Sequence, residues 1–128
     1  MGTNYFLHPR GPCECCGRPF PRQHIGKSSV GWVFNLHVDA EHTSLDDWVA
    51  AWSQPDAVIV DEYGRPVTGD DMLAIITERS GSGRFDEAFH RHNHSVDGPN
   101  GLARSKIDGS RCVGYGEGTW DLIAGEFS

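Results

Sequence analysis

The clearest alternation of apolar and polar positions lies at residues 31–38. Asn35 and His37 in this segment lie between large apolar residues, which are Trp32, Phe34, Leu36 and Val38. A period of two predicts a β-strand with one buried face. The segment 23–28 precedes it across a short turn, so the two are expected to form a β-hairpin. The β-forming residues 4–8 predict an earlier strand.

Two amphipathic helices are predicted after the hairpin. The first has apolar residues at i, i+3, i+4 and i+7, which form one stripe: Leu45, Trp48, Val49 and Trp52. Thr43 or Ser44 can cap its start, and Pro55 follows its end. Thr68 can cap a second helix, whose inward positions are Met72, Ile75 and Ile76.

The pattern weakens after residue 80. It predicts one helical turn at 85–89, a polar loop at 90–101, a hairpin on an Asp-Gly turn at 107–113 and a closing strand at 120–127. The predicted fold class is α+β: a small antiparallel sheet with two packed helices and an N-terminal zinc knuckle. We expect one domain over 1–128, with a knuckle and hairpin part at 1–38 and an α+β body at 39–128.

Composition and charge narrow the function classes. The 128 residues are 38% hydrophobic and 23% charged, which is typical of a globular chain. No apolar run is long enough for a membrane span, and residues 1–12 lack a signal peptide's apolar core, so we expect a cytoplasmic protein without membrane contact. The net charge of −7 arises from residues 39–87, which contain twelve acidic residues and three arginines. This acidity disfavours duplex DNA as a partner.

The strongest chemical motif is Cys13-x-x-Cys16-Gly17. Two residues between the thiolates let both reach one ion, and the glycine permits the tight turn that structural zinc knuckles use. Zinc needs two further ligands, for which His24 and His37 are the simplest choice if the hairpin forms. His8 and Cys15 are reserve ligands. A redox dithiol or free thiols are the alternatives, although Pro19 and Pro21 disfavour the helix that redox motifs open.

A histidine-rich segment offers a competing site. His90, His92 and His94 would project from one face of an extended strand and, with Asp97, could hold a metal that activates water. The simpler interpretation is a solvated loop in which histidines cluster by chance.

Two weaker binding sites are also predicted. Lys27, Ser28 and Ser29 could bind an anion at the hairpin turn, although Pro21 replaces the glycine that a P-loop needs. A single-stranded nucleic acid could bind basic residues together with stacking aromatic rings. The residues for this set are Arg10, Arg18, Arg22, Lys27, Phe20 and Trp32.

The two ends of the chain resemble a family of small, uncharacterised bacteriophage-encoded proteins. The resemblance lies in Met1–Tyr5, the Cys-x-x-Cys-Gly-Arg knuckle, His24–Ser29 with Gly31-Trp32, and Gly116–Asp121. It implies an accessory role in the host cytoplasm, and it implies no catalytic residues.

The function expected from the sequence is a zinc-stabilised binding protein. It would contact a host or phage macromolecule through the knuckle and hairpin or through the acidic segment, without being an enzyme. The alternatives are a metal-dependent hydrolase, nuclease-like, that uses the His90–His94 cluster, and a single-stranded nucleic-acid binder.

Overall fold

The structure is a computed structural model that describes residues 2–8, 22–81, 85–106, 112–125 and 127. Its strands are β1 (Gly2–His8), β2 (Gln23–Ser29), β3 (Phe34–Val38), β4 (Val58–Asp61), β5 (Pro66–Val67), β6 (Ser95–Asp97), β7 (Ala103–Ser105), β8 (Cys112–Tyr115) and β9 (Trp120–Ala124). Its helices are α1 (Leu45–Trp52), α2 (Gly69–Thr77), α3 (Glu87–Asn93) and the 3₁₀ turn η1 (Pro99–Gly101).

The predicted α+β class is confirmed, but the sheet is mixed and not antiparallel throughout. Seven strands pair in the order β5-β4-β1-β2-β3-β9-β8. The hairpin β2–β3 and the pair β1–β2 are antiparallel, as expected. By contrast, β3 and β9 run parallel, with Phe34 opposite Trp120 and Val38 opposite Ala124. Alternation along a strand specifies a buried face but not the direction of a distant partner, so the sequence pattern did not reveal this pair.

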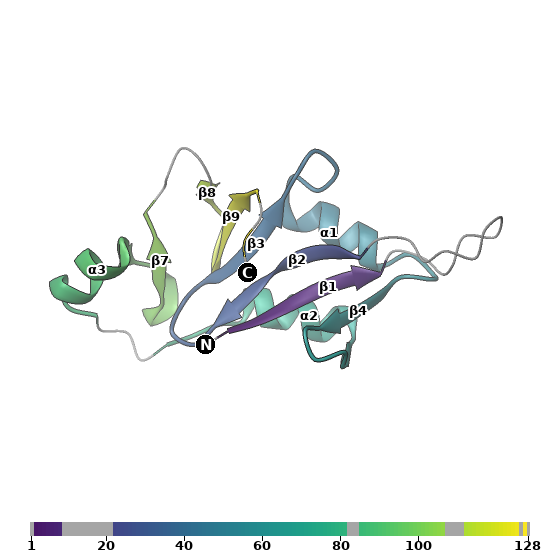
Figure 1. The fold of residues 1–128 in the computed structure, drawn as a ribbon, viewed down its shortest axis with the longest axis horizontal. Coiled ribbons are helices and arrows are strands. Elements are labelled where there is room, and N and C mark those ends of the chain that lie inside the picture. The colour runs from purple at the N-terminus through teal and green to yellow at the C-terminus, as the bar shows by residue number, and fades with distance from the viewer. Residues whose placement is uncertain (1, 9–21, 82–84, 107–111, 126, 128) are drawn as a thin grey trace.

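The helices α1 and α2 lie together behind one face of the sheet (Figure 1). Their predicted stripes are confirmed: Trp48, Met72 and Ile76 are fully buried, against Phe34 and Leu36 of β3. Both helices begin where their capping residues predict. The Ser44 hydroxyl accepts a hydrogen bond from the Asp47 backbone N–H, and the Thr68 hydroxyl accepts one from that of Asp71.

A β-bulge interrupts the pairing of β1 with β2. Tyr5 pairs with Gly26 and Phe6 pairs with His24, so Ile25 has no opposite residue in β1. Ile25 is fully buried in the core, and Gly26 lies against the Phe34 ring on the same face. Because two successive residues share the core face, His24 remains on the opposite face, which we call the open face of the sheet.

The segment 90–101 is not the loop that the sequence predicted. The helix starting near residue 85 continues as α3 to Asn93, and β6 pairs with β7 across η1. Asp86 caps α3 through its side chain, and His94 ends it in the left-handed conformation at φ 52°. No helix in the described part of the chain is long and apolar enough to cross a membrane.

Gly26 supplies the first test of this fold. A Cβ at this position would overlap the Asn35 carbonyl oxygen and the Phe34 ring. We expect Gly26→Ala to lower the free energy of unfolding by about 2 kcal/mol or more, because the core strand cannot shift without losing its pairing. Chemical denaturation measures the change. Val30→Ala is the control, since Val30 is 94% exposed. If both variants changed the free energy of unfolding equally little, the close packing of Gly26 against Phe34 and Asn35 would be contradicted.

Candidate metal centre

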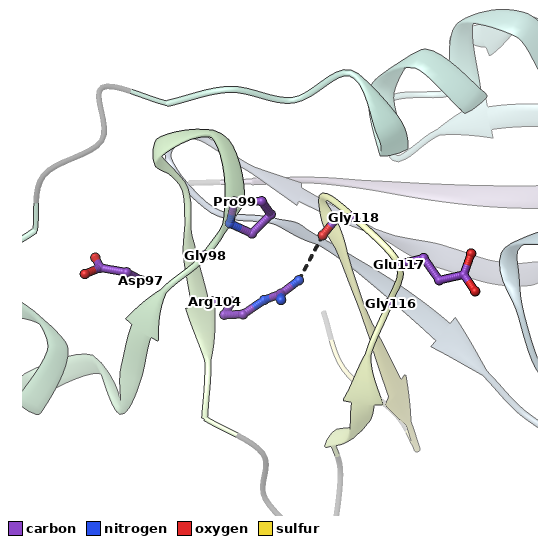
Figure 2. A pocket seen from close by; sticks show the side chains of 7 residues that line it. All are labelled: Asp97, Gly98, Pro99, Arg104, Gly116, Glu117 and Gly118. Atoms are coloured by element: carbon purple, nitrogen blue, oxygen red, sulfur yellow. Dashed lines mark hydrogen bonds between the residues drawn. The ribbon is translucent and has the colours of Figure 1, made fainter.

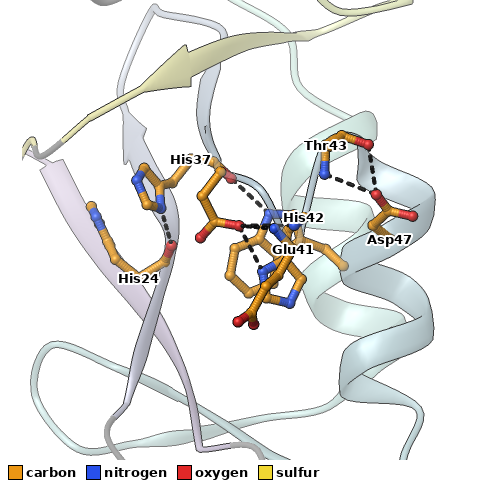
Figure 3. A network of polar contacts seen from close by, with 8 residues as sticks. His24, His37, Glu41, His42, Thr43 and Asp47 are labelled. Carbon is orange, nitrogen blue, oxygen red and sulfur yellow. Dashed lines mark hydrogen bonds and ion pairs between the residues drawn. The ribbon is translucent and has the colours of Figure 1, made fainter.

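His24 and His37 come together on the open face of the sheet. Their strands β2 and β3 are neighbours, and in β3 Leu36 and Val38 point into the core while His37 points away from it. The two imidazole rings lie 5.9 Å apart between centroids, with planes 26° from parallel. Figure 3 shows both side chains on the same side of the sheet.

Each histidine has one ring nitrogen against an oxygen acceptor. His24 Nε2 lies 2.8 Å from Asn4 Oδ1, and His37 Nδ1 lies 3.1 Å from the His24 carbonyl oxygen. An oxygen of this kind only accepts, so these nitrogens carry the protons. In its neutral form, each imidazole then has its lone pair on the other nitrogen, Nδ1 in His24 and Nε2 in His37. Histidines that bind metals characteristically donate their other N–H in this way.

Aromatic side chains surround the two imidazoles. The Phe127 ring lies 4.7 Å from that of His24 and 5.8 Å from that of His37, and the Phe6 ring lies 5.3 Å from that of His24. The Arg22 guanidinium lies 4.0 Å over the Phe6 ring. The histidines are consequently half-buried among aromatic rings and not loosely solvated.

The predicted cysteine ligands Cys13 and Cys16, with the reserve ligand Cys15, lie outside the described residues. The other reserve ligand, His8, ends β1 opposite Val58 of β4. Leu7 pairs with Gln23, so the chain leaves β1 and enters β2 at the same end of the sheet, next to His24. Seven residues lie between Cys16 and His24 along the chain. At about 3.3 Å per residue, that length lets the thiolate reach the imidazole.

The spacing of the two rings is compatible with one tetrahedral zinc. With Zn–N bonds of about 2.0–2.1 Å, two imidazoles on one ion have centroids about 5–6 Å apart. Within the described ranges, no three metal-ligating side chains come together. A zinc here would therefore need donors from the rest of the chain, as the cysteine motif predicts.

His42, which the sequence analysis did not single out, lies close to this centre. Its ring stacks on the Trp48 indole at 3.9 Å and 9°, and its Nδ1 lies 3.3 Å from Asp39 Oδ1 (Figure 3). Burial alone would raise the pKa of Asp39, but hydrogen bonds from the backbone N–H groups of His42 and Glu41 outweigh it and lower the pKa. The Trp48 Nε1–H donates to the His37 carbonyl at 2.7 Å. This network fixes the start of α1 and the backbone of His37.

The structure does not assemble the histidine-rich site. The extended strand on which it depends is wrong, because residues 87–93 are helical, and in a helix residues two apart do not share a face. His90 contacts Asp97, Nε2 to Oδ1 at 2.9 Å, and Ser95 Oγ through Nδ1 at 2.8 Å. His92 and His94 are exposed and take no part in these contacts.

The Ser95–His90–Asp97 contacts have the wrong exposure for a catalytic triad. Ser95 is fully buried, whereas the Asp97 side chain is 77% exposed. A nucleophilic serine must reach substrate, and its orienting aspartate works best when buried. These contacts instead join α3 to β6.

The remaining predicted residues are dispersed. Lys27, Ser28 and Ser29 lie within β2, where they pair with Asn4, Thr3 and Gly2. Only Ser29 takes part in the turn, because its carbonyl oxygen accepts a hydrogen bond from the Trp32 backbone N–H at 3.1 Å. In the nucleic-acid set, Arg22 precedes β2, while Trp32 follows it at the far end and contacts Phe89 of α3. Arg10, Arg18 and Phe20 lie outside the described residues. The described members therefore do not form one surface.

A groove of about 440 Å³ lies between the β6–β7 hairpin and the turn before β9 (Figure 2). Arg104 lies at its centre, donates to the Gly118 carbonyl at 3.0 Å and stacks on Tyr115 at 4.3 Å. Asp97 and Glu117 also line the groove, and in this view their side chains point away from Arg104 on opposite sides. Arg104 Nε also lies 3.1 Å from Oδ1 of Asp121, which is fully buried. Burial raises the pKa of Asp121 to about 6, although the Arg104 guanidinium lowers it in part.

Comparisons of the chain with protein-family models, with curated proteins and with solved structures give no match.

Asp121 predicts a pH dependence of stability. Its folded pKa of about 6 exceeds the ordinary 3.8, so the folded state binds the proton more tightly than the unfolded state. Stability from this group is greatest below about pH 4 and is lost as the pH rises towards 6, by up to about 3 kcal/mol. We expect Asp121→Asn to remove that slope in denaturation curves measured between pH 4 and 7.

Asp61→Asn is the matched control. Burial raises the pKa of Asp61, but hydrogen bonds from the Arg65 and Tyr63 backbone N–H groups and from the Arg65 guanidinium lower it overall. The contribution of Asp61 to stability is lost only as the pH falls below about 3.8. Above pH 5, the free energy of unfolding of Asp61→Asn should therefore change with pH in parallel with that of wild type. If the free energy of unfolding of Asp121→Asn also changed with pH in parallel with that of wild type between pH 4 and 7, Asp121 would not be the source of the pH dependence.

Proposed function

We propose that the protein is a zinc-stabilised binding protein, with zinc held by Cys13, Cys16, His24 and His37. The observation that supports this best is the pair of adjacent histidines, each donating its other N–H to an oxygen. Four protein ligands leave no open coordination position, so the ion would be structural and not catalytic. It would fasten the cysteine segment to the open face of the sheet.

The proposed binding surface is the acidic outer side of the helical layer. Exposed carboxylates lie in the first turns of α1 and α2, at the C-cap of α2, and in the loops that follow α1 and β4; they are Asp46, Asp70, Asp71, Glu78, Asp56 and Glu62. Such a surface attracts a partner with a basic surface and speeds its association. Following the resemblance to phage proteins, that partner would be a host or phage protein in the host cytoplasm.

Neither alternative function draws support from the geometry. A hydrolase would need His90, His92, His94 and Asp97 around one ion, and only His90 and Asp97 are in contact. A nucleic-acid platform would need Arg22 beside Trp32, which lie at opposite ends of β2.

Metal analysis tests the zinc proposal. We expect the purified chain to contain one zinc per molecule, and His24→Ala and His37→Ala each to lose most of it, because two thiolates and one imidazole hold the ion less tightly. His92→Ala is the matched control, since His92 is exposed on α3, and should keep the full equivalent. Elemental analysis after dialysis gives the stoichiometry. A metal-free wild type, or zinc retained in both His24 and His37 variants, would refute the site.

Metal removal tests the structural role. Since a structural zinc contributes to folding free energy directly, we expect a strong chelator to lower the melting temperature by about 10 °C or more. Cobalt substitution provides a check that does not depend on any variant: tetrahedral thiolate ligation gives visible and charge-transfer bands. Unchanged melting after complete removal of bound zinc would contradict a structural ion.

A further inference from the structure

We infer that Asn4 is a positioning residue that selects the metal-binding nitrogen of His24. This inference rests on the zinc site proposed above and concerns residues that the structure describes. Asn4 lies on β1, on the open face, and its Oδ1 is 2.8 Å from His24 Nε2. The contact fixes the proton on Nε2, so Nδ1 is the nitrogen that would bind the proposed zinc.

The backbone holds Asn4 in place for this task. Its own N–H donates to Glu62 Oε1 at 2.9 Å, and it pairs with Lys27 of β2. The bulge at Ile25 lies between these pairs and the Phe6–His24 pair. It keeps both Lys27 and His24 on the open face, so that the Asn4 side chain can reach along the strand to His24.

The second histidine is oriented by the first. His37 Nδ1–H donates to the carbonyl oxygen of His24 at 3.1 Å, which leaves the lone pair on Nε2 of His37. The site would therefore use unlike nitrogens, Nδ1 of His24 and Nε2 of His37. A change at Asn4 acts on the His24 ring directly and leaves the backbone contact of His37 unchanged.

Phe127 completes the arrangement. Its ring contacts both imidazoles, at 4.7 and 5.8 Å between centroids, and limits their rotation. Ligands whose rings are already fixed lose less freedom on binding the ion, which favours tight binding. Asn4 supplies the polar part of this fixation and Phe127 the apolar part.

Zinc affinity of Asn4 variants tests the inference. We expect Asn4→Ala to weaken binding about 10- to 100-fold in competition with a chromophoric chelator. Asn4→Asp keeps the acceptor oxygen and should stay within a few-fold of wild type. Asn35→Ala is the matched control, because Asn35 is an asparagine of β3 on the same face that pairs with Lys27. Circular dichroism verifies that each variant is folded.

Histidine NMR supplies a readout that a merely structural role would not change. In zinc-loaded wild type, long-range ¹⁵N–¹H spectra should show His24 protonated at Nε2 and His37 at Nδ1. In Asn4→Ala the Nε2 proton of His24 should exchange faster, while His37 is unchanged. The opposite tautomers in wild type, or an affinity of Asn4→Ala equal to that of Asn35→Ala, would overturn the inference and leave the zinc site intact. A wild type that binds no zinc would refute the proposed function itself.

Discussion

The parallel pairing of β3 with β9 is the constraint on which the rest of the structure depends. It joins Phe34–Val38 to Trp120–Ala124, segments separated by most of the chain. Closing so long a loop costs conformational entropy, which is offset by apolar burial, since Trp120 and Leu122 pack on the core and Ile123 is 8% exposed. The same pairing places Asp121 beside Arg104 and leads the chain to Phe127, which lies against His24 and His37. The groove and the candidate metal centre therefore share one structural cause.

The two faces of the sheet are covered by different kinds of side chain. Behind it, α1 and α2 supply a continuous apolar layer around Trp48. On the open face, polar and aromatic side chains are held by short specific contacts, as with Asn4, His24 and His37. The network of His42 and Trp48 joins the two sides, because the Trp48 indole donates to the carbonyl of His37. The position of a candidate ligand is thus coupled to the packing of the core.

The parts of the fold that could be predicted from sequence are those specified by neighbours along the chain. Caps at Ser44 and Thr68 and the i, i+3, i+4 spacing define α1 and α2, and alternation defines β3. The direction of β9, the bulge at Ile25 and the extension of α3 depend on contacts that are distant in sequence, which no local pattern specifies. The proximity of His24 and His37 could be predicted from the sequence, because a hairpin places them on neighbouring strands. The contributions of Asn4, Phe127 and the Asp39–His42 contact could not be predicted, because each joins the site from another strand or from a loop.

The unequal apolar cover of the two sheet faces gives a physical reason for the proposed zinc. A domain of 128 residues buries only a moderate fraction of its surface, and here most of the apolar core lies on one side of the sheet. Covering the second face with a third apolar layer would require a longer chain. A zinc that fastens a short segment across His24 and His37 would achieve part of the same cover with four side chains and few apolar residues. The sheet would then be closed behind by helices and in front by an ion, and its acidic helical side would remain exposed for a partner.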